Sequence, residues 1–410
     1  MNPESFQFDN QNQTITPDLK VQVLLITLVR TVFSTANRVV YPFLSYFARG
    51  MGVTIGDISL ALTARAMVGV VSPFIASLAD RYNKRFGMLI GAGLFTAGNA
   101  MIWIWPIFTV FAIGMSVAFL GVFVFVASSQ AFIGDEVQYQ QRGTMIAIVE
   151  MNWSLAFIAG VPLVGLLVAA KGWMAPFPLF TILGAASLIA TWKAIPGGRP
   201  ATHQPLGLKQ NLGTVFSSRS AVAALVMAVA ITAANEVINL MFGVWLEDSY
   251  QLKIAALGAA SIVIGSSELF GEGLTALFTD KIGKKRMVVI SLLLNMLVAL
   301  SMPWIANSVA GALIGLFLFY ITFETMIVSS LPIMTEILPS ARATLMGLVI
   351  GAFSLGRAVG ALLAPLLYVY GFRVNTFATI LLNLVALYAL TRIQVKPEGK
   401  KPFPKNKIAY

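Results

Sequence analysis

Long apolar segments dominate this chain and constrain its fold more than any other feature. Twelve runs, bounded by charges, proline or glycine, are close to or above the roughly 18–20 residues that an α-helix needs to cross a bilayer. Charged residues make up only 11% of the 410 residues. That is about half the share typical of soluble domains, and too little to cover a water-facing surface. These features predict an all-α, polytopic membrane protein.

The predicted spans form two sets of six, separated by one polar segment that is rich in proline and glycine. The first set covers about 20–47, 56–79, 86–105, 107–131, 143–169 and 173–193, and the second about 219–246, 254–279, 287–305, 309–332, 342–369 and 373–393. We therefore expect an N-terminal tail (1–19), a first six-helix bundle (20–193), a linker (194–218), a second six-helix bundle (219–394) and a basic tail (395–410).

Basic residues are unequally divided between the two sides of the predicted membrane domain. If both termini lie on one side, the loops and tails on that side carry 20 lysines and arginines, and the opposite loops carry four. Such an excess marks the cytoplasmic side of a membrane protein. We expect a multi-pass protein of the cell membrane with both termini in the cytoplasm. Its basic residues then face membrane lipids rather than nucleic acid.

The composition excludes several kinds of chemistry. The chain has no cysteine, and His203 is its single histidine. Disulfides, thiolate metal sites and the usual Cys/His or Ser/His nucleophile pairs are therefore excluded. No segment reads G-x-x-x-x-G-K-[ST], which argues against a nucleotide-driven motor. We expect no enzymatic activity, no cofactor and no metal site.

The two halves of the chain repeat each other at an offset of 200 residues. The loop D-R-Y-N-K-R (80–85) aligns with D-K-I-G-K-K (280–285), and further pairs in register are Glu136 and Glu336, Arg142 and Arg342, and Gly160 and Gly360. Shared loop chemistry at constant spacing indicates a duplicated six-helix unit. Because each unit has an even number of helices, the repeats run parallel and are related by an axis along the membrane normal.

These features resemble the major facilitator superfamily of secondary transporters over residues 20–394. The family loop between helices 2 and 3 reads G-x-x-x-D-R-x-G-R-[KR], and this chain has Ala76 and Asn83 at the two glycine positions. The resemblance implies two six-helix bundles, a small-molecule substrate, a monomer and cytoplasmic loops that act as latches. The residues that match the latches are Asp80, Arg81, Lys84, Arg85, Arg142, Asp280, Lys281, Lys284, Glu336 and Arg342. Alternatively, these charges only anchor the loops.

A further resemblance lies in the fifth predicted span. Its segment G-V-P-L-V-G (160–165) partly matches a motif ending G-P-x-x-G-G in the proton-driven drug antiporters of this superfamily. Pro162 and Gly165 fit the motif, whereas the first glycine is one position early and the final glycine pair is missing. The resemblance implies proton-coupled efflux. Close helix packing explains the small residues at least as well.

Ionisable residues inside the predicted spans are the main functional signal, because each costs several kcal/mol unless it is paired or hydrated. The first half contains Arg30, Arg38, Arg65 and Glu150, and the second contains Glu236, Glu268, Glu272, Glu324 and Arg357. Carboxylates crowded together in a low-dielectric medium hold protons readily. The expected proton-coupling residues are Glu268, Glu272, Glu324 and Glu150.

Depth along the helices, together with the helix neighbours that the resemblance implies, predicts how these charges pair. Arg30 and Glu150 lie about 15 and 12 Å from the cytoplasmic ends of helices 1 and 5, which are neighbours in the family, so an ion pair of functional or purely structural role is expected. Arg38 and Glu236 both lie about 25 Å deep in helices 1 and 7, which in the family meet near the outside, so an extracellular gate is expected. Arg357 is the expected counter-charge of Glu268, Glu272 and Glu324. Arg65 has no obvious partner and is expected to bind an anionic substrate group or a backbone carbonyl.

Polar residues next to these charges complete the expected site. Helical spacing places Asn37 and Tyr41 beside Arg38, Asn235 and Asn239 beside Glu236, and Asn152 and Trp153 beside Glu150. They form a candidate substrate site together with Arg38, Arg65, Glu236 and Arg357. Membrane asparagines also commonly bond one helix to another, which is the alternative role.

The sequence thus predicts a secondary active transporter that moves a small amphipathic molecule by alternating access, as a proton-coupled antiporter working in efflux. The alternative is a uniporter or symporter of an organic anion or lipid-like amphiphile, with Arg38, Arg65 and Arg357 as anion ligands. A membrane-embedded enzyme would need a nucleophile–base pair or a metal cluster, and a receptor would usually carry a long soluble extension. Neither feature is present in this sequence.

Overall fold

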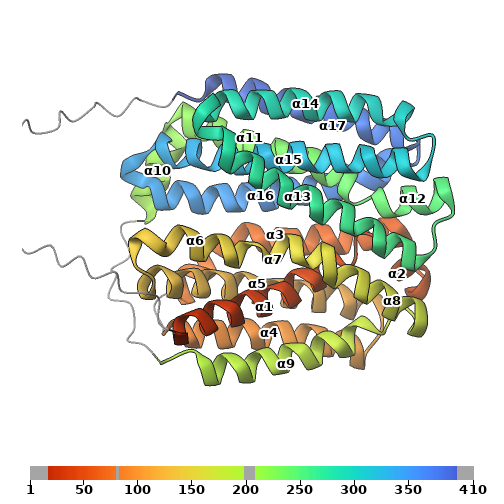
Figure 1. Ribbon diagram of the computed structural model, residues 1–410, viewed down its shortest axis with the longest axis horizontal. Coiled ribbons are helices and arrows are strands. Elements are labelled where there is room, and N and C mark those ends of the chain that lie inside the picture. The colour runs from red at the N-terminus through yellow and green to blue at the C-terminus, as the bar shows by residue number, and fades with distance from the viewer. Residues whose placement is uncertain (1–16, 80–82, 198–207, 395–410) are drawn as a thin grey trace, which may run out of the picture.

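The computed structural model describes residues 17–79, 83–197 and 208–394, and within these ranges it contains helices and no strand. Eleven of the described helices are long and apolar enough to cross a membrane, and the number is twelve if the bent pair Leu44–Met51 and Ile55–Val71 is one span. Figure 1 shows the helices running roughly side by side in two groups, red to yellow and green to blue. The predicted all-α membrane fold is confirmed.

The first bundle follows the order of the predicted spans, with several spans broken into shorter helices. It comprises α1 (Pro17–Arg38), α2 (Leu44–Met51), α3 (Ile55–Ala79), α4 (Lys84–Ile104), α5 (Phe108–Glu136), α6 (Tyr139–Glu150), α7 (Asn152–Leu155), the π-helical turn η1 (Ala156–Gly160), α8 (Val161–Lys171) and α9 (Pro176–Ala194).

The second bundle has the same plan. It comprises α11 (Arg219–Asn239), α12 (Phe242–Tyr250), α13 (Ile254–Ile282), α14 (Lys284–Ile305), α15 (Val309–Ile337), the 3₁₀ turn η2 (Pro339–Ala341), α16 (Arg342–Tyr368) and α17 (Phe372–Arg392). One further helix, α10 (Leu208–Ser217), lies in the segment expected to be only a linker, and it packs on α11 and α16. Its Val215 is fully buried, so this part of the linker belongs to the packed structure.

The first helix of each bundle is broken at a corresponding position. The chain turns at residues 39–43 between α1 and α2, where Pro42 removes a backbone donor, and it breaks again at 240–241 between α11 and α12. The two breaks touch, because a Cβ added to Gly243 would lie 2.6 Å from the carbonyl oxygen of Pro42. Broken helices in matching positions of two repeats commonly mark the binding site of a transporter.

Two ends of the molecule serve as reference points below. The terminal side is where α1 begins and α17 ends, on the left of Figure 1, and the far side is where α2, α8 and α12 lie, on the right.

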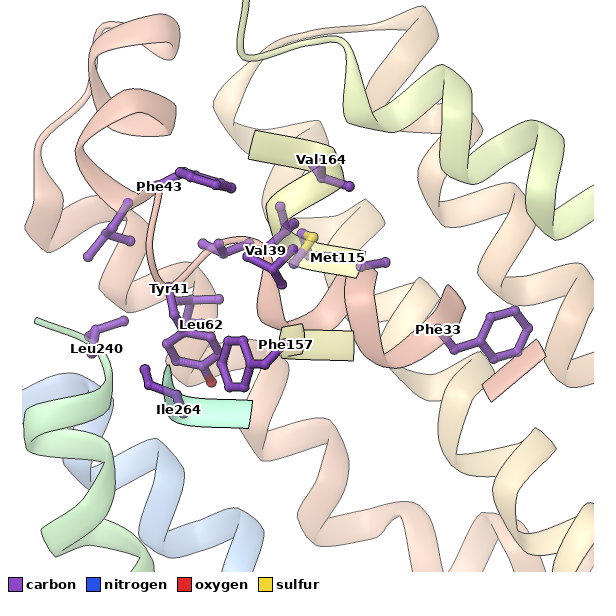
Figure 2. Close-up of a cluster of buried hydrophobic side chains, with 14 of the residues drawn as sticks. Phe33, Val39, Tyr41, Phe43, Leu62, Met115, Phe157, Val164, Leu240 and Ile264 are labelled. Carbon is purple, nitrogen blue, oxygen red and sulfur yellow. The ribbon is translucent and has the colours of Figure 1, made fainter. Parts of the chain in front are cut away.

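The two bundles are joined tightly on the far side. There α8 packs along α13, and a Cβ on Gly165 would lie 3.3 Å from the Cα of Gly258. An ion pair joins Arg49 to Glu247 at 2.7 Å, again across the bundles. One hydrophobic core contains residues of both bundles, and Figure 2 shows Tyr41 and Phe157 of the first beside Leu240 and Ile264 of the second.

Toward the terminal side, the fifth span no longer packs against the eighth span. The segments α7, η1 and α8 pack along α13, whereas α6 packs on α1 and α5 of its own bundle. The buried residues near the terminal side of the second bundle form a separate hydrophobic core without any residue of the first. The structure is therefore closed on the far side, while α3 and α16 keep the bundles together along their length.

The predicted latch residues make contacts inside each bundle, and these contacts repeat between the halves. Lys84 pairs with Asp135, and Lys284 with Glu336. Lys285 donates to the carbonyl of Ile393 at 3.0 Å as Arg85 donates to that of Trp192. Each of Arg142 and Arg342 donates to a backbone carbonyl a few residues earlier, at 3.3 and 2.9 Å.

The ion pairs of Lys84 and Lys284 stay within their own bundles. Asp280 makes no ion pair among the described residues, Lys281 lies 5.9 Å from the ring of Phe278, and Asp80 and Arg81 lie outside the described residues. In this state the described charges anchor loops within a bundle. Their role as latches between bundles stays a prediction for the state closed on the terminal side.

The contact between the fifth and eighth spans gives a first test. A Cβ on Gly265 of α13 would lie 2.9 Å from the backbone oxygen of Ser154 and 2.8 Å from Ile158, whereas a Cβ on Gly273 of the same helix meets nothing within 4 Å. We expect Gly265→Ala to lower stability by about 1–3 kcal/mol, because the two helices must move apart. Gly273→Ala is expected to be neutral or stabilising. Thermal unfolding in detergent compares the two, and equal effects would contradict this packing.

Candidate functional site

Ionisable side chains gather where the breaks in the first and seventh spans meet. Arg38 is the last residue of α1, and both carboxylate oxygens of Glu268 lie 2.8–2.9 Å from its Nη1. The pair joins the bundles, and its side chains are only 12% and 7% exposed. The Arg38 guanidinium also lies 4.1 Å from the ring of Phe157 and 4.8 Å from that of Trp153. Phe157 stands in η1, and such single π turns occur frequently at functional sites.

The predicted gate between Arg38 and Glu236 is wrong. Arg38 pairs with Glu268 instead, while the Glu236 carboxylate accepts a hydrogen bond from Asn239 Nδ2 at 3.2 Å and lies near the Tyr41 hydroxyl. The prediction used depth and the contact between helices 1 and 7 that the family resemblance implies. Equal depth along two helices does not fix which way each side chain faces.

Glu236 belongs to a cluster of buried polar side chains at the contact between the bundles. Arg65 donates to the Asn37 carbonyl and to the Tyr41 hydroxyl, both at 3.1 Å, and the Tyr41 hydroxyl lies near Glu236. Asn239 extends the cluster, because its Oδ1 accepts from the Tyr320 hydroxyl at 2.6 Å. We call Arg65, Tyr41, Glu236, Asn239 and Tyr320 the Tyr41 network. All five side chains belong to residues less than 9% exposed.

The ion pair between Arg30 and Glu150 forms as the depths predicted. It is bidentate, with N–O distances of 2.9 and 3.0 Å, and it lies within the first bundle. The Arg30 side chain is 3% exposed and that of Glu150 is 32% exposed. The proton-coupling role given to Glu150 stays a prediction.

Three ionisable residues inside the spans have no close partner. Glu272, Glu324 and Arg357 make no hydrogen bond and no ion pair within 4.0 Å to any residue in the described ranges. We call Glu272 and Glu324 the unpaired carboxylates. Both are partly exposed, and the carboxylates of Glu268 and, from the opposite bundle, Glu150 act electrostatically on Glu272. A Cβ on Gly271 would lie 2.8 Å from Glu324, so α13 and α15 bring these acids together.

Arg357 does not pair with Glu268, Glu272 or Glu324 as predicted. Its neighbours Gly356 and Gly360 pack on α11, and Ser354 and Ala361 face α3. At 100° per residue, Arg357 lies between these two faces of α16 and is directed into the space between α11 and α3. It acts electrostatically on Glu236, for which it is the largest charge influence, and also on Glu268 and Glu324.

Of the remaining predicted site residues, one is hydrogen-bonded between helices and two have side-chain atoms without a partner. Asn152 accepts from Ser34 at 2.5 Å and donates to the Val149 carbonyl at 2.7 Å, which matches the alternative helix-bonding role. Asn37 and Asn235 are each 7% exposed, and the Nδ2 of Asn37 and the Oδ1 of Asn235 have no hydrogen-bond partner. Phe157 and Tyr320 were not predicted as site residues. The spacing of Tyr320 four residues before Glu324 was the available signal.

Two six-helix bundles with ionisable side chains at their interface define a secondary transporter. The sequence profile of the Major Facilitator Superfamily matches residues 26–335 and 225–409. The chain belongs to this superfamily. It is a multi-pass membrane transporter and not an enzyme, as predicted.

Relatives and solved structures agree with this assignment. The chain is 24% identical over 375 residues to the uncharacterized MFS-type transporter YwfA of Bacillus subtilis, covering 88% of this chain and 90% of that one. It is 23% identical to the inner membrane transport protein YdhP of Escherichia coli, covering 84% and 88%. By fold, it is similar to a D-xylose-proton symporter, with TM-score 0.76, 14% identity and coverage of 93% and 98%. A bacterial homologue of the human lysosomal transporter Spinster, in its inward-facing form, gives TM-score 0.74 at 12% identity, with coverage of 92% and 95%.

Proposed function

We propose that this chain is a proton-coupled secondary transporter that moves a small amphipathic molecule across the cell membrane. The proposal places the terminal side in the cytoplasm, because the loops and tails on that side carry 20 basic residues against four. It takes the monomer as the working unit. The observation that carries it is the pair of unpaired carboxylates, Glu272 and Glu324, next to an ion pair that joins the bundles.

The Arg38–Glu268 pair is the element that couples protons to conformation. Both of its ends are buried and belong to different bundles, so their separation accompanies any opening of the far side. A proton on Glu268 removes the charge that Arg38 holds and weakens the contact. Glu272 lies one helical turn away on α13 and is partly exposed, so it is the natural donor or acceptor of that proton.

The unpaired carboxylates explain why a proton biases one state. An ionised carboxylate within the membrane is tolerated when water or a counter-charge reaches it. Opening toward the cytoplasm keeps Glu272 and Glu324 hydrated, and closure on that side favours their protonated forms. The two states then differ in proton affinity, which is the requirement for coupling.

Efflux stays a prediction from the helix 5 resemblance. In the structure, Pro162 and Gly165 pack against Gly258 of α13, which is the packing role that was the alternative. Close packing at this point seals the far side of the present state. It is compatible with either direction of transport.

Transport in proteoliposomes tests the proposed function. A ligand is first identified by thermal shift with a broad compound panel at two pH values, since a ligand that binds with a proton stabilises differently at each. We expect that ligand to accumulate against its own gradient when a pH gradient is imposed, and a protonophore to abolish this accumulation. Accumulation that ignores both treatments would contradict proton coupling.

A further inference from the structure

Two arginines act on Glu236, the carboxylate of the Tyr41 network. Arg65 and Arg357 both act electrostatically on Glu236, and neither forms an ion pair within 4.0 Å in the described part of the chain. With Glu236 ionised, the two arginines and this carboxylate carry one excess positive charge. An intramembrane charge without a partner is costly and marks a functional site.

Buried polar atoms without partners surround the same place. Nε of Arg65, Nδ2 of Asn37 and Oδ1 of Asn235 are buried and form no hydrogen bond, and the three residues are 4%, 7% and 7% exposed. Arg65 donates to the backbone carbonyl of Asn37, so these two residues are in direct contact. Asn235 precedes Glu236 and shares a helix face with Asn239 of the Tyr41 network. Unsatisfied buried groups are rare in native proteins and point to a missing ligand or water.

The unpartnered atoms and the two guanidinium groups together suit one kind of ligand. Two unsatisfied donors and an unpaired guanidinium suit an anion with two oxygens, because guanidinium binds carboxylates through parallel hydrogen bonds. The unsatisfied acceptor of Asn235 suits a hydroxyl or N–H group near that anion.

We propose that Arg357, Arg65, Asn37 and Asn235 bind the acidic end of the substrate, which is an amphipathic carboxylic acid with a nearby hydrogen-bond donor. The substrate carboxylate replaces Glu236 as the counter-ion of Arg357, and Glu236 takes up one proton from solution. One negative and one positive charge enter together, so the net charge of the site is unchanged. Arg38 is no ligand in this scheme, because Glu268 already occupies its guanidinium.

The groups that face Glu236 allow this exchange. They are Arg357 from α16, Arg65 from α3, the Tyr41 hydroxyl after α1 and Asn239 on α11, with Tyr320 from α15 behind Asn239. From α17, Asn375 and Thr379 bond to backbone carbonyls of α11 and bring no charge. The helix α10 meets α11 near its start, far along the helix from Glu236. Protonated Glu236 retains the Asn239 donor as a partner.

This inference rests on the proposed function for the location of the substrate site, and it decides between two alternatives left by the sequence. Binding of the anion and the proton together predicts co-transport of an organic acid with a proton. An exchanger would instead release a proton when its substrate binds.

The test uses matched probes on the full-length protein in detergent. Each set shares one body and differs in its end group: 4-hydroxyphenylacetate, 4-hydroxyphenylacetamide and tyramine, and equivalent sets that carry a hydroxyl group next to that end or a longer alkyl body. We expect the carboxylate of at least one set to bind about 10- to 100-fold more tightly than its amide, because charge-assisted hydrogen bonds are lost in the amide. Binding is expected to take up a proton, measured with a pH indicator in weak buffer.

Variants place the effect on the proposed residues. Arg357→Gln is expected to remove the carboxylate preference and Arg357→Lys to restore part of it, whereas Arg373→Gln, an exposed arginine of α17, leaves it unchanged. Glu236→Gln is expected to bind the carboxylate without proton uptake. The inference is overturned if no set prefers the carboxylate, if tyramine binds best, or if Arg357→Gln keeps the preference. These equilibrium measurements need no gradient, so their failure is distinct from failure of proton-driven transport.

Discussion

Replacing Arg38 by methionine is expected to destabilise the protein by about 3–5 kcal/mol, because it leaves Glu268 buried without its counter-charge. The double variant Arg38→Met/Glu268→Met is expected to recover most of that loss, since apolar residues of similar volume replace a buried ion pair at little or no cost. Both variants are expected to lose proton-driven transport. Thermal or denaturant unfolding in detergent measures the first effect, and proteoliposome transport the second.

The second ion pair between the bundles provides the control. Arg49 pairs with Glu247 on the far side, and its side chain is 57% exposed. Exposed pairs contribute at most about 1 kcal/mol, so Arg49→Met is expected to have a small effect on stability. Equal losses for Arg38→Met and Arg49→Met, or no recovery in the double variant, would show that the Arg38–Glu268 pair does not act as described.

Replacing both unpaired carboxylates is expected to impair transport without the loss of stability expected for Arg38→Met. Glu272→Gln/Glu324→Gln keeps side-chain shape and removes two charges that have no close partner in the described residues, so stability is expected to stay the same or rise. Accumulation driven by a pH gradient is expected to fall strongly, because only a proton taken up at Glu236 then remains, while downhill equilibration of the same substrate continues. The reason is that the two conformations then no longer differ in proton affinity at these positions.

Glu136→Gln is the matched control for that variant, because Glu136 is an exposed carboxylate at the terminal end of α5. It is expected to transport like the unmodified protein. If Glu272→Gln/Glu324→Gln still accumulates substrate with the normal dependence on pH, these carboxylates do not carry the coupled proton.

The sequence predicted the fold well because the signal for a membrane span is local. Apolar length and bounding charges mark each helix, and the 200-residue repeat marks the two bundles, without knowledge of any contact. The breaks were harder to predict. The first span was expected to run unbroken over 20–47, although Pro42 was an available signal, and residues 240–241 carry no proline or glycine to mark the second break.

The site was predicted in its composition but only partly in its pairing. Arg30 and Glu150 were matched correctly because their helices are neighbours within one bundle. Arg38 was matched to the wrong acid, because packing across the interface sets the rotation of each helix. The depth of a residue along its helix carries no information on that rotation. The latch role between bundles is not tested by this structure. A sequence encodes every state of a transporter, whereas one structure shows one of them.

Solvent access to Glu272 tests the central claim most directly, namely that the unpaired carboxylates face water between the bundles on the cytoplasmic side. The chain has no cysteine, so Glu272→Cys and the matched control Phe270→Cys each carry a single thiol on α13. Phe270 is 62% exposed, and at 100° per residue it lies on the opposite side of α13 from Glu272, where we expect lipid. A charged, membrane-impermeant thiol reagent added to the cytoplasmic side is expected to modify Glu272→Cys and to spare Phe270→Cys. If Glu272→Cys stays unmodified while the exposed Lys193→Cys on the same side reacts, the carboxylates lie in a dry interface and the account is contradicted.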